Sequence, residues 1–224
     1  MDSTQIVEWL ERESSVAFRA DLSARYGIPN DNALGVKMST MKAMAKELGR
    51  DHDLASQLWS TGVYEARILA AFVEEPAQVT PEQMDAWAAE FDSWAICDAV
   101  CMHLFDKTPY AWEKAFAWAL EPEEFVRRAG FARFWALSVH DKKAPDEKFI
   151  LALKTIENAE PDARPLVKKA IDMALRAIVK RNAGLRSEAM AVAERMASSK
   201  DRDRAWIGRH AHRELSTRTA RGES

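Results

Sequence analysis

The sequence has little of what marks a disulfide-stapled or membrane-spanning protein. Its 224 residues include two cysteines, Cys97 and Cys101, which are too few and too close in sequence for a disulfide framework. No uncharged apolar run reaches the ~18 residues needed to cross a bilayer, and the acidic N-terminus lacks a signal-peptide layout. The eight glycines are scattered rather than gathered in a phosphate-binding loop. We therefore expect a cytoplasmic protein that does not contact the membrane.

Strand signals are also scarce. Alternating runs of β-branched residues are absent, whereas Ala, Leu, Met, Glu, Lys and Arg dominate. Most prolines after residue 75 stand where a helix is expected to begin, and Thr80 with Gln83 has the spacing of a capping box. These features predict an all-α fold.

The predicted helices come in pairs. The second members lie near residues 63–74, 93–105, 123–138, 165–180 and 201–215. They recur at intervals of roughly 30–40 residues, the range of two-helix repeats. Such hairpins cannot bury their apolar faces alone, so we expect them to stack into a curved α-solenoid with a concave inner surface. An ordinary helical bundle is the alternative.

We expect one domain over residues 1–224. Its parts would be N-terminal helices in 1–50, repeats over about 51–216 and a short basic tail at 217–224. Repeats of this kind need no partner subunit, so we expect a monomer with no obligate protein partner.

Charge is unevenly distributed along the chain. Residues 1–160 hold 17 Lys and Arg against 27 Asp and Glu, whereas residues 161–224 hold 15 against 8, although the net charge is only −3. A basic C-terminal third on an acidic protein indicates a surface that binds a polyanion. Solvated helix faces that happen to be basic are the alternative.

Trp94 and Asp98 stand out because they lie one helical turn apart in a segment that otherwise resembles helix core. In SWAICDAVCMHLF (93–105), Asp98 is the only formal charge. Burying an unpaired carboxylate costs several kcal/mol, so a packing helix seldom carries one without a partner or a function. On a helix the two side chains project from one face. The structural alternative is that Asp98 pairs with an Arg of the next repeat.

Basic residues on the later helices could form the flanks of a groove around this pair. The candidate DNA-binding residues are Arg127, Lys168, Lys169, Arg176 and Arg181, with Arg128 beside them. If the second helices line the concave surface, such a groove suits a phosphate backbone, which supplies most nucleic-acid affinity.

An indole and a carboxylate have no use in phosphate binding, but they suit a cationic substrate. An indole face attracts a cation by ~0.5–2 kcal/mol, and a carboxylate stabilises positive charge that develops on a sugar. A purine alkylated at N3 or N7 is itself cationic, so it can leave without the general acid of ordinary glycoside hydrolysis. Asp98 could then position water, while Arg128 holds a nearby phosphate and keeps Asp98 ionised.

The other reactive or aromatic side chains are expected to be structural. Cys97, Cys101 and His103 do not share one helix face, so we expect no metal site. His103 and four other tryptophans are expected in the core: Trp112, Trp118, Trp135 and Trp206. No Ser/His/Asp signature is present.

At these residues the sequence resembles the bacterial DNA alkylation repair proteins, AlkD-type alkylpurine DNA glycosylases built from HEAT-like repeats. The segments that carry the resemblance are ALGVKMSTMKAMAKEL (33–48), LWSTGVYEARILAAF (58–72), SWAICD (93–98), FVRRAGF (125–131) and VKKAIDMALRAIVKRN (167–182). Each motif alone is weak, but five in the family's order cover most of the chain.

The resemblance implies a glycosylase that excises N3- or N7-alkylated purines from duplex DNA without inserting the base into a protein pocket. By position, Asp98 would be the catalytic carboxylate, Trp94 a lesion-contacting aromatic and Arg128 the partner of the phosphate and lesion strand. Arg176 would be a backbone contact. The resemblance implies no metal and no organic cofactor.

Two residues depart from the family pattern. Met173, which would lie near the lesion, replaces a second Trp, and Ala95 replaces an acid that often follows the first Trp. Met packs softly but offers no comparable attraction for a cation. The alternatives to an enzyme are a non-catalytic HEAT-repeat protein that binds DNA and a protein-interaction scaffold that never contacts DNA.

Overall fold

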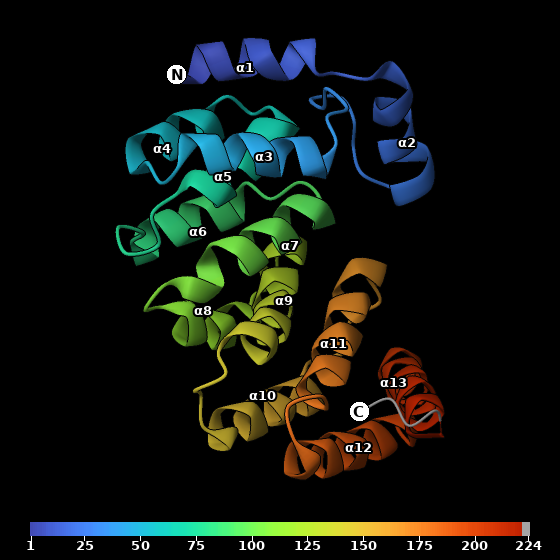
Figure 1. Ribbon diagram of the computed structural model, residues 1–224. Helices are drawn as coiled ribbons and strands as arrows, with labels where there is room; N and C mark the ends of the chain where they lie inside the picture. The colour runs from blue at the N-terminus through green and yellow to red at the C-terminus, as the bar shows by residue number, and fades with distance from the viewer. Residues whose placement is uncertain (221–224) are drawn as a thin grey trace. The chain divides into compact units, whose positions relative to one another are not determined.

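The structure is a computed structural model that describes the backbone of residues 1–220 and the side chains of residues 1–216. Over these residues the chain forms thirteen α-helices, one 3-10 helix and no strand, which confirms the predicted all-α fold (Figure 1). The basic tail predicted at 217–224 lies outside the residues whose side chains are described. The chain divides into two compact units, Met1–Pro109 and Tyr110–Ser224, and we describe each by itself.

The first unit is built around its fifth helix. Its elements are α1 (Ser3–Arg12), α2 (Val16–Tyr26), α3 (Met38–Leu48), α4 (His52–Ser60), α5 (Tyr64–Val73), α6 (Pro81–Ala89), α7 (Trp94–His103) and η1 (Phe105–Lys107). Helix α5 packs against α1, α3, α4 and α7, and nearly all of its residues are buried. The position of α7 within this unit therefore depends on α5.

The helix starts in this unit follow local capping chemistry. Thr80 accepts a hydrogen bond from the Gln83 backbone N–H at 3.2 Å, and Pro81 occupies the first helical position of α6. Ser93 caps α7 by accepting from the Ile96 N–H at 3.3 Å. Each cap satisfies a donor that the first turn leaves without a helical partner.

A buried carboxylate fixes the segment before α3 onto α5. Glu65 is 0% exposed. Its Oε2 accepts from the Leu34 N–H at 2.9 Å, and its Oε1 accepts from the Gly35 N–H at 2.7 Å and the Val36 N–H at 3.1 Å. Because all three bonds are charge-assisted, together they offset the desolvation of the carboxylate.

Glycine is required at the centre of this contact. Gly35 has φ +87°, and a Cβ there would lie 2.3 Å from the Ser15 carbonyl oxygen and 2.7 Å from the Arg19 nitrogen. Only glycine tolerates both the backbone conformation and the close approach. The two N-terminal segments that carry the family resemblance, 33–48 and 58–72, thus meet at Glu65.

The second unit consists of three helical hairpins. Its helices are α8 (Ala111–Trp118), α9 (Glu124–His140), α10 (Asp146–Asn158), α11 (Pro165–Ile178), α12 (Ala183–Ala197) and α13 (Arg202–Ala220). Helix α9 packs against α8 and α11, and α13 packs against α11 and α12. Helices α8 and α9 approach so closely that a Cβ on Gly130 would lie 2.3 Å from the Ala119 nitrogen.

Each predicted second member of a pair is a helix in the structure. The second members are α5, α7, α9, α11 and α13, and each begins within a few residues of its predicted start.

Across the described residues, none of the helices has the length and apolar character that a membrane span requires.

The Glu65 contact predicts a specific loss of stability. In Glu65→Gln, the amide NH₂ would face backbone N–H donors, so at least one buried donor loses its acceptor. We expect the free energy of unfolding to fall by about 2 kcal/mol or more, measured by urea denaturation. The matched control, Glu47→Gln on the exposed face of α3, should change it by less than about 0.5 kcal/mol. Equal effects of the two variants would contradict this role for Glu65.

Candidate nucleic-acid interface

Trp94 begins α7 and is held in place by a contact with α2. Its indole Nε1–H donates to the Tyr26 carbonyl oxygen at 3.0 Å, while the preceding Ser93 caps the helix. The indole is half-buried rather than enclosed. The anchor fixes the ring and leaves part of it accessible. Sequence reasoning missed Tyr26, because a backbone acceptor 68 residues away has no sequence signature.

Asp98 is half-buried on the same helix, one turn after Trp94. The buried residues of α7 are Ile96, Cys97, Ala99, Val100 and Cys101. The carboxylate thus lies at the margin of the buried face, where it can keep contact with solvent. The structure places Trp94 and Asp98 together in the first unit.

The two cysteines and the histidine of α7 are packed against the rest of the first unit. The thiols of Cys97 and Cys101 are buried and not joined in a disulfide, and the His103 ring packs on Phe72 with centroids 4.6 Å apart. Among the residues that the structure describes, no group of three or more His, Cys, Asp and Glu is arranged to hold a metal ion.

The two adjacent arginines of α9 bind the chain segment that leads into α11. Arg127 Nη2 donates to the Glu160 carbonyl oxygen at 2.8 Å, and its Nη1 lies 3.5 Å from the Asp162 carboxylate. Arg128 is 4% exposed, and its Nη1 donates to the Leu166 carbonyl oxygen at 2.6 Å. Both guanidinium groups therefore stabilise the second unit, and a DNA contact for either stays a prediction.

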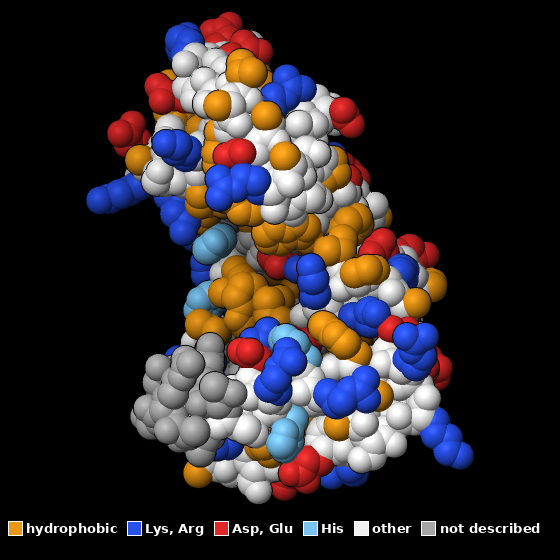
Figure 2. All heavy atoms as spheres, turned by 90° about the vertical axis from the view of Figure 1, so that its right-hand side faces the viewer, with side chains coloured by type: hydrophobic (Ala, Val, Ile, Leu, Met, Phe, Trp, Pro, Cys, Tyr) orange, Lys and Arg blue, Asp and Glu red, His pale blue; other side chains and the backbone are white. Residues whose placement is uncertain are grey.

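The two lysines of α11 differ in their surroundings. Lys168 Nζ pairs with Asp203 at 2.6 Å and lies 5.8 Å from the centroid of Trp206. Lys169 is exposed. Figure 2, which views the side on which α13 lies in Figure 1, shows Lys, Arg and His side chains close together on this part of the surface. Of the two lysines, Lys169 is the better placed to bind a phosphate.

Arg176 is oriented by a buried carboxylate. Asp172, which is 3% exposed, accepts from Arg176 Nε at 2.9 Å and lies 3.0 Å from His210 Nδ1. The contact with Asp172 sets the plane of the Arg176 guanidinium, which stays about a third exposed. Asp172 and His210 were missed in the sequence, because their pairing joins α11 to α13.

Arg181 binds the last turn of α9 and the loop between α9 and α10. Its Nη1 donates to the carbonyl oxygens of Ser138 and Asp141 at 3.2 and 2.9 Å, and its Nη2 donates to that of Ala144 at 3.2 Å. Its guanidinium carbon lies 3.9 Å from the centroid of Phe149. These contacts occupy the side chain, so the predicted DNA contact of Arg181 gains no support here.

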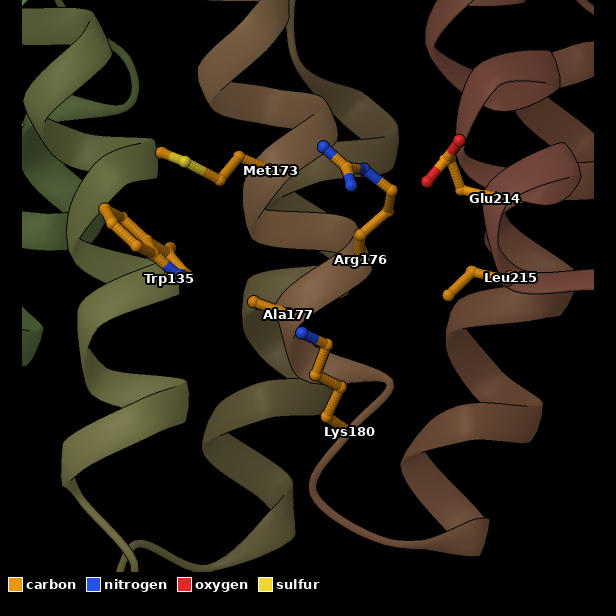
Figure 3. A pocket seen from close by; sticks show the side chains of 7 residues that line it. All are labelled: Trp135, Met173, Arg176, Ala177, Lys180, Glu214 and Leu215. Atoms are coloured by element: carbon orange, nitrogen blue, oxygen red, sulfur yellow. The ribbon is translucent and has the colours of Figure 1, made fainter. Parts of the chain in front are cut away.

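Met173 and Arg176 share a cavity that sequence reasoning did not anticipate (Figure 3). Trp135 of α9, expected in the core, is instead half-buried and lines this cavity beside Met173. The same expectation is wrong for Trp206, which is 39% exposed, whereas Trp118 is buried as predicted. The sequence around these tryptophans did not separate the cases, since each of the three lies on a helix beside buried apolar residues.

Comparisons with known proteins found one family model and one solved structure that match this chain. The model of a family described as DNA alkylation repair enzyme matches residues 10–215. A solved structure also matches the whole chain, with a TM-score of 0.83 and 19% sequence identity, and the match covers 96% of that chain. It comes from work on a new family of proteins related to the HEAT-like repeat DNA glycosylases with affinity for branched DNA structures. No curated protein sequence matches.

At this identity the structural likeness shows the fold. It confirms that the helical hairpins belong to the α-solenoid class of HEAT-like repeats that the sequence predicts. It does not by itself assign a reaction to Asp98 or to any other residue.

The ion pairs around Arg127 predict a pH dependence of stability. Arg164 donates to Asp162 at 2.9 and 2.6 Å, and these hydrogen bonds, with the charges of Arg164 and Arg127, lower the pKa of Asp162 below its usual 3.8. Because the folded state holds the proton more weakly than the unfolded state does, the stabilisation is complete above pH 3.8 and is lost as the pH falls through the lower folded-state pKa.

We therefore expect Asp162→Asn to be less stable than the wild type near neutral pH, with the difference shrinking below pH 3.8. Urea denaturation at several pH values measures this. Asp53→Asn, at an exposed position of α4, is the control and should show little difference at any pH. A difference for Asp162→Asn that stays constant into acid would contradict the assignment.

Proposed function

Because the chain belongs to the DNA alkylation repair enzyme family, we propose that it is a DNA glycosylase that releases N3- and N7-alkylated purines from duplex DNA. One observation carries this proposal. Asp98 lies half-buried one turn from an anchored indole, on a helix whose other face is packed in the core.

Asp98 supplies the one carboxylate that this reaction needs. The bond from the sugar C1′ to the purine nitrogen breaks, and its electron pair neutralises the positive charge of the departing base. The sugar acquires oxocarbenium character, which the Asp98 carboxylate stabilises. Water then attacks C1′ and transfers a proton to Asp98, which leaves an abasic site. No general acid is required, because the base leaves as a neutral molecule.

Trp94 presents an indole face to the cationic nucleotide. The hydrogen bond from Nε1 to the Tyr26 carbonyl oxygen orients the ring before substrate arrives. A cation held against an indole gains ~0.5–2 kcal/mol. Because this attraction acts on the alkylated and not on the neutral base, it favours damaged over intact DNA.

The second unit supplies the contacts to the DNA backbone in this proposal. Lys169 is exposed, and Arg176 is partly exposed and oriented by Asp172. A contact of Arg128 with the lesion strand rests on the family resemblance alone, because this side chain is 4% exposed and donates to the Leu166 carbonyl oxygen. We propose that the protein acts as a monomer in the cytoplasm and needs neither a metal nor an organic cofactor.

A second candidate function is DNA binding without catalysis. Two observations favour it: Met173 and Ala95 replace side chains typical of the glycosylases, and the matching solved structure belongs to proteins described as having affinity for branched DNA. A scaffold that binds only proteins is the third candidate. The basic surface of the second unit argues against it.

The decisive variant is Asp98→Asn, which keeps the shape of the side chain and removes its charge. We expect the release of 7-methylguanine or 3-methyladenine from alkylated duplex DNA to fall at least ~100-fold, measured by chromatography of the freed base. DNA affinity should be unchanged or higher, since a carboxylate near phosphates repels them.

The matched control is Asp53→Asn, which should release base at the wild-type rate. Equal rates for wild type and Asp98→Asn would remove Asp98 from the reaction. If neither protein releases base while both bind DNA, the non-catalytic function is correct.

The phosphate contact of Lys169 predicts a change in salt dependence. Lys169→Ala should weaken duplex binding and lower the slope of log affinity against log salt concentration by about one. Lys154→Ala removes an exposed lysine from α10, the first helix of its hairpin, and should leave the slope unchanged. Fluorescence anisotropy at several salt concentrations measures both slopes. Identical slopes for wild type and Lys169→Ala would exclude this residue from the interface.

A further inference from the structure

A cavity of about 150 Å³ opens within the second unit, between α9, α11 and α13. Its lining residues are Trp135, Met173, Arg176, Ala177, Lys180, Glu214 and Leu215. Figure 3 shows Trp135 on α9, Met173 on α11 pointing toward α9, and Glu214 on α13 pointing toward α11, where Arg176 lies. The cavity thus combines an apolar wall with charged groups of both signs.

The size of the cavity limits what can enter. A protein cavity of roughly 150 Å³ holds one benzene-sized ring, whereas sites for drug-sized ligands measure about 300–1,000 Å³. One heteroaromatic ring therefore fits, and any sugar or phosphate attached to it stays at the opening. The indole of Trp135 and the thioether of Met173 supply an apolar wall for such a ring.

The cations beside the cavity match the phosphate of a nucleotide. Arg176 lies in the last turn of α11 and Lys180 lies just after the end of this helix, and both side chains line the cavity. The Arg176 guanidinium is held by the buried Asp172 at 2.9 Å, which reduces the entropy lost when it binds an anion. Lys180 is exposed.

The Glu214 carboxylate can discriminate between bases. A carboxylate accepts hydrogen bonds and donates none, so it pairs with the exocyclic amino group of cytosine. Thymine presents a carbonyl oxygen at the same position, which a carboxylate repels. A pyrimidine ring also matches the volume of the cavity.

We propose that this cavity receives the base of one unpaired nucleotide of DNA, cytosine in preference to thymine, while Arg176 and Lys180 bind its phosphates. The proposal rests on the proposed function in that DNA is the ligand. It differs from the recognition without a base pocket that the family resemblance implies.

The test compares the binding of a paired duplex with that of the same duplex carrying one extra cytidine or thymidine as a bulge. We expect wild type to bind the cytidine bulge at least about fivefold more tightly than the paired duplex, the low end of what one base stacked on an aromatic ring contributes. Trp135→Leu should lose most of this preference and keep its affinity for the paired duplex. Trp206→Leu, at an exposed tryptophan outside the cavity, should keep the preference.

Glu214→Gln provides a readout that a loss of folding cannot mimic. This variant should bind cytidine and thymidine bulges more nearly alike, because an amide can also donate to the thymine carbonyl. Equal binding of bulged and paired DNA by wild type would overturn the proposal. So would a preference that survives in Trp135→Leu or disappears in Trp206→Leu.

The assay of base release, run on the same preparations, separates this proposal from the glycosylase. Release of alkylated base without any bulge preference overturns the cavity proposal alone. Bulge preference without release supports the cavity and overturns the glycosylase. If the protein binds neither the paired nor the bulged duplex, both the glycosylase and the cavity proposal are overturned.

Discussion

The hydrogen bonds between the Glu65 carboxylate and the backbone N–H groups of residues 34–36 hold the first unit together at its centre. They join the segment before α3 to α5, and α5 is the helix on which α7 packs. A carboxylate without these donors could not stay buried there. The positions of Trp94 and Asp98 within this unit therefore rest on a contact far from either side chain in the sequence.

In the second unit, arginine side chains take the part that the Glu65 carboxylate has in the first: they bind backbone groups of neighbouring segments. Arg127 and Arg181 bind backbone carbonyl oxygens of the loops that connect the helices, and Arg128 binds one in the first turn of α11. Loops that end helices leave carbonyl oxygens without helical partners, and a guanidinium can satisfy several at once. Much of the basic character of this part of the chain is therefore used in stabilising the hairpins. Lys169 and the cavity beside Arg176 are the places where we propose that DNA binds.

The helices and their pairing could be predicted because burial repeats along the sequence with the period of the helix. The starts of α7 and α11 follow from Ser93 and Pro165, which are local signals. The partners of polar groups could not be predicted. A basic residue on an apolar helix face gives the same sequence pattern whether it binds a loop carbonyl, as Arg127 does, or a phosphate. The exposure of Trp135 could not be predicted either, because an indole that lines a cavity and an indole in the core can occupy the same position in the helical pattern.

Two acidic residues in similar sequence surroundings differ in their exposure to solvent. Asp98 on α7 and Asp172 on α11 each lie on the second helix of a hairpin among apolar residues. Asp172 is 3% exposed and bound by Arg176 and His210, so its charge is committed to positioning them. Asp98 is half-buried. The two carboxylates therefore differ in how far solvent reaches them, and their sequence surroundings do not contain this difference.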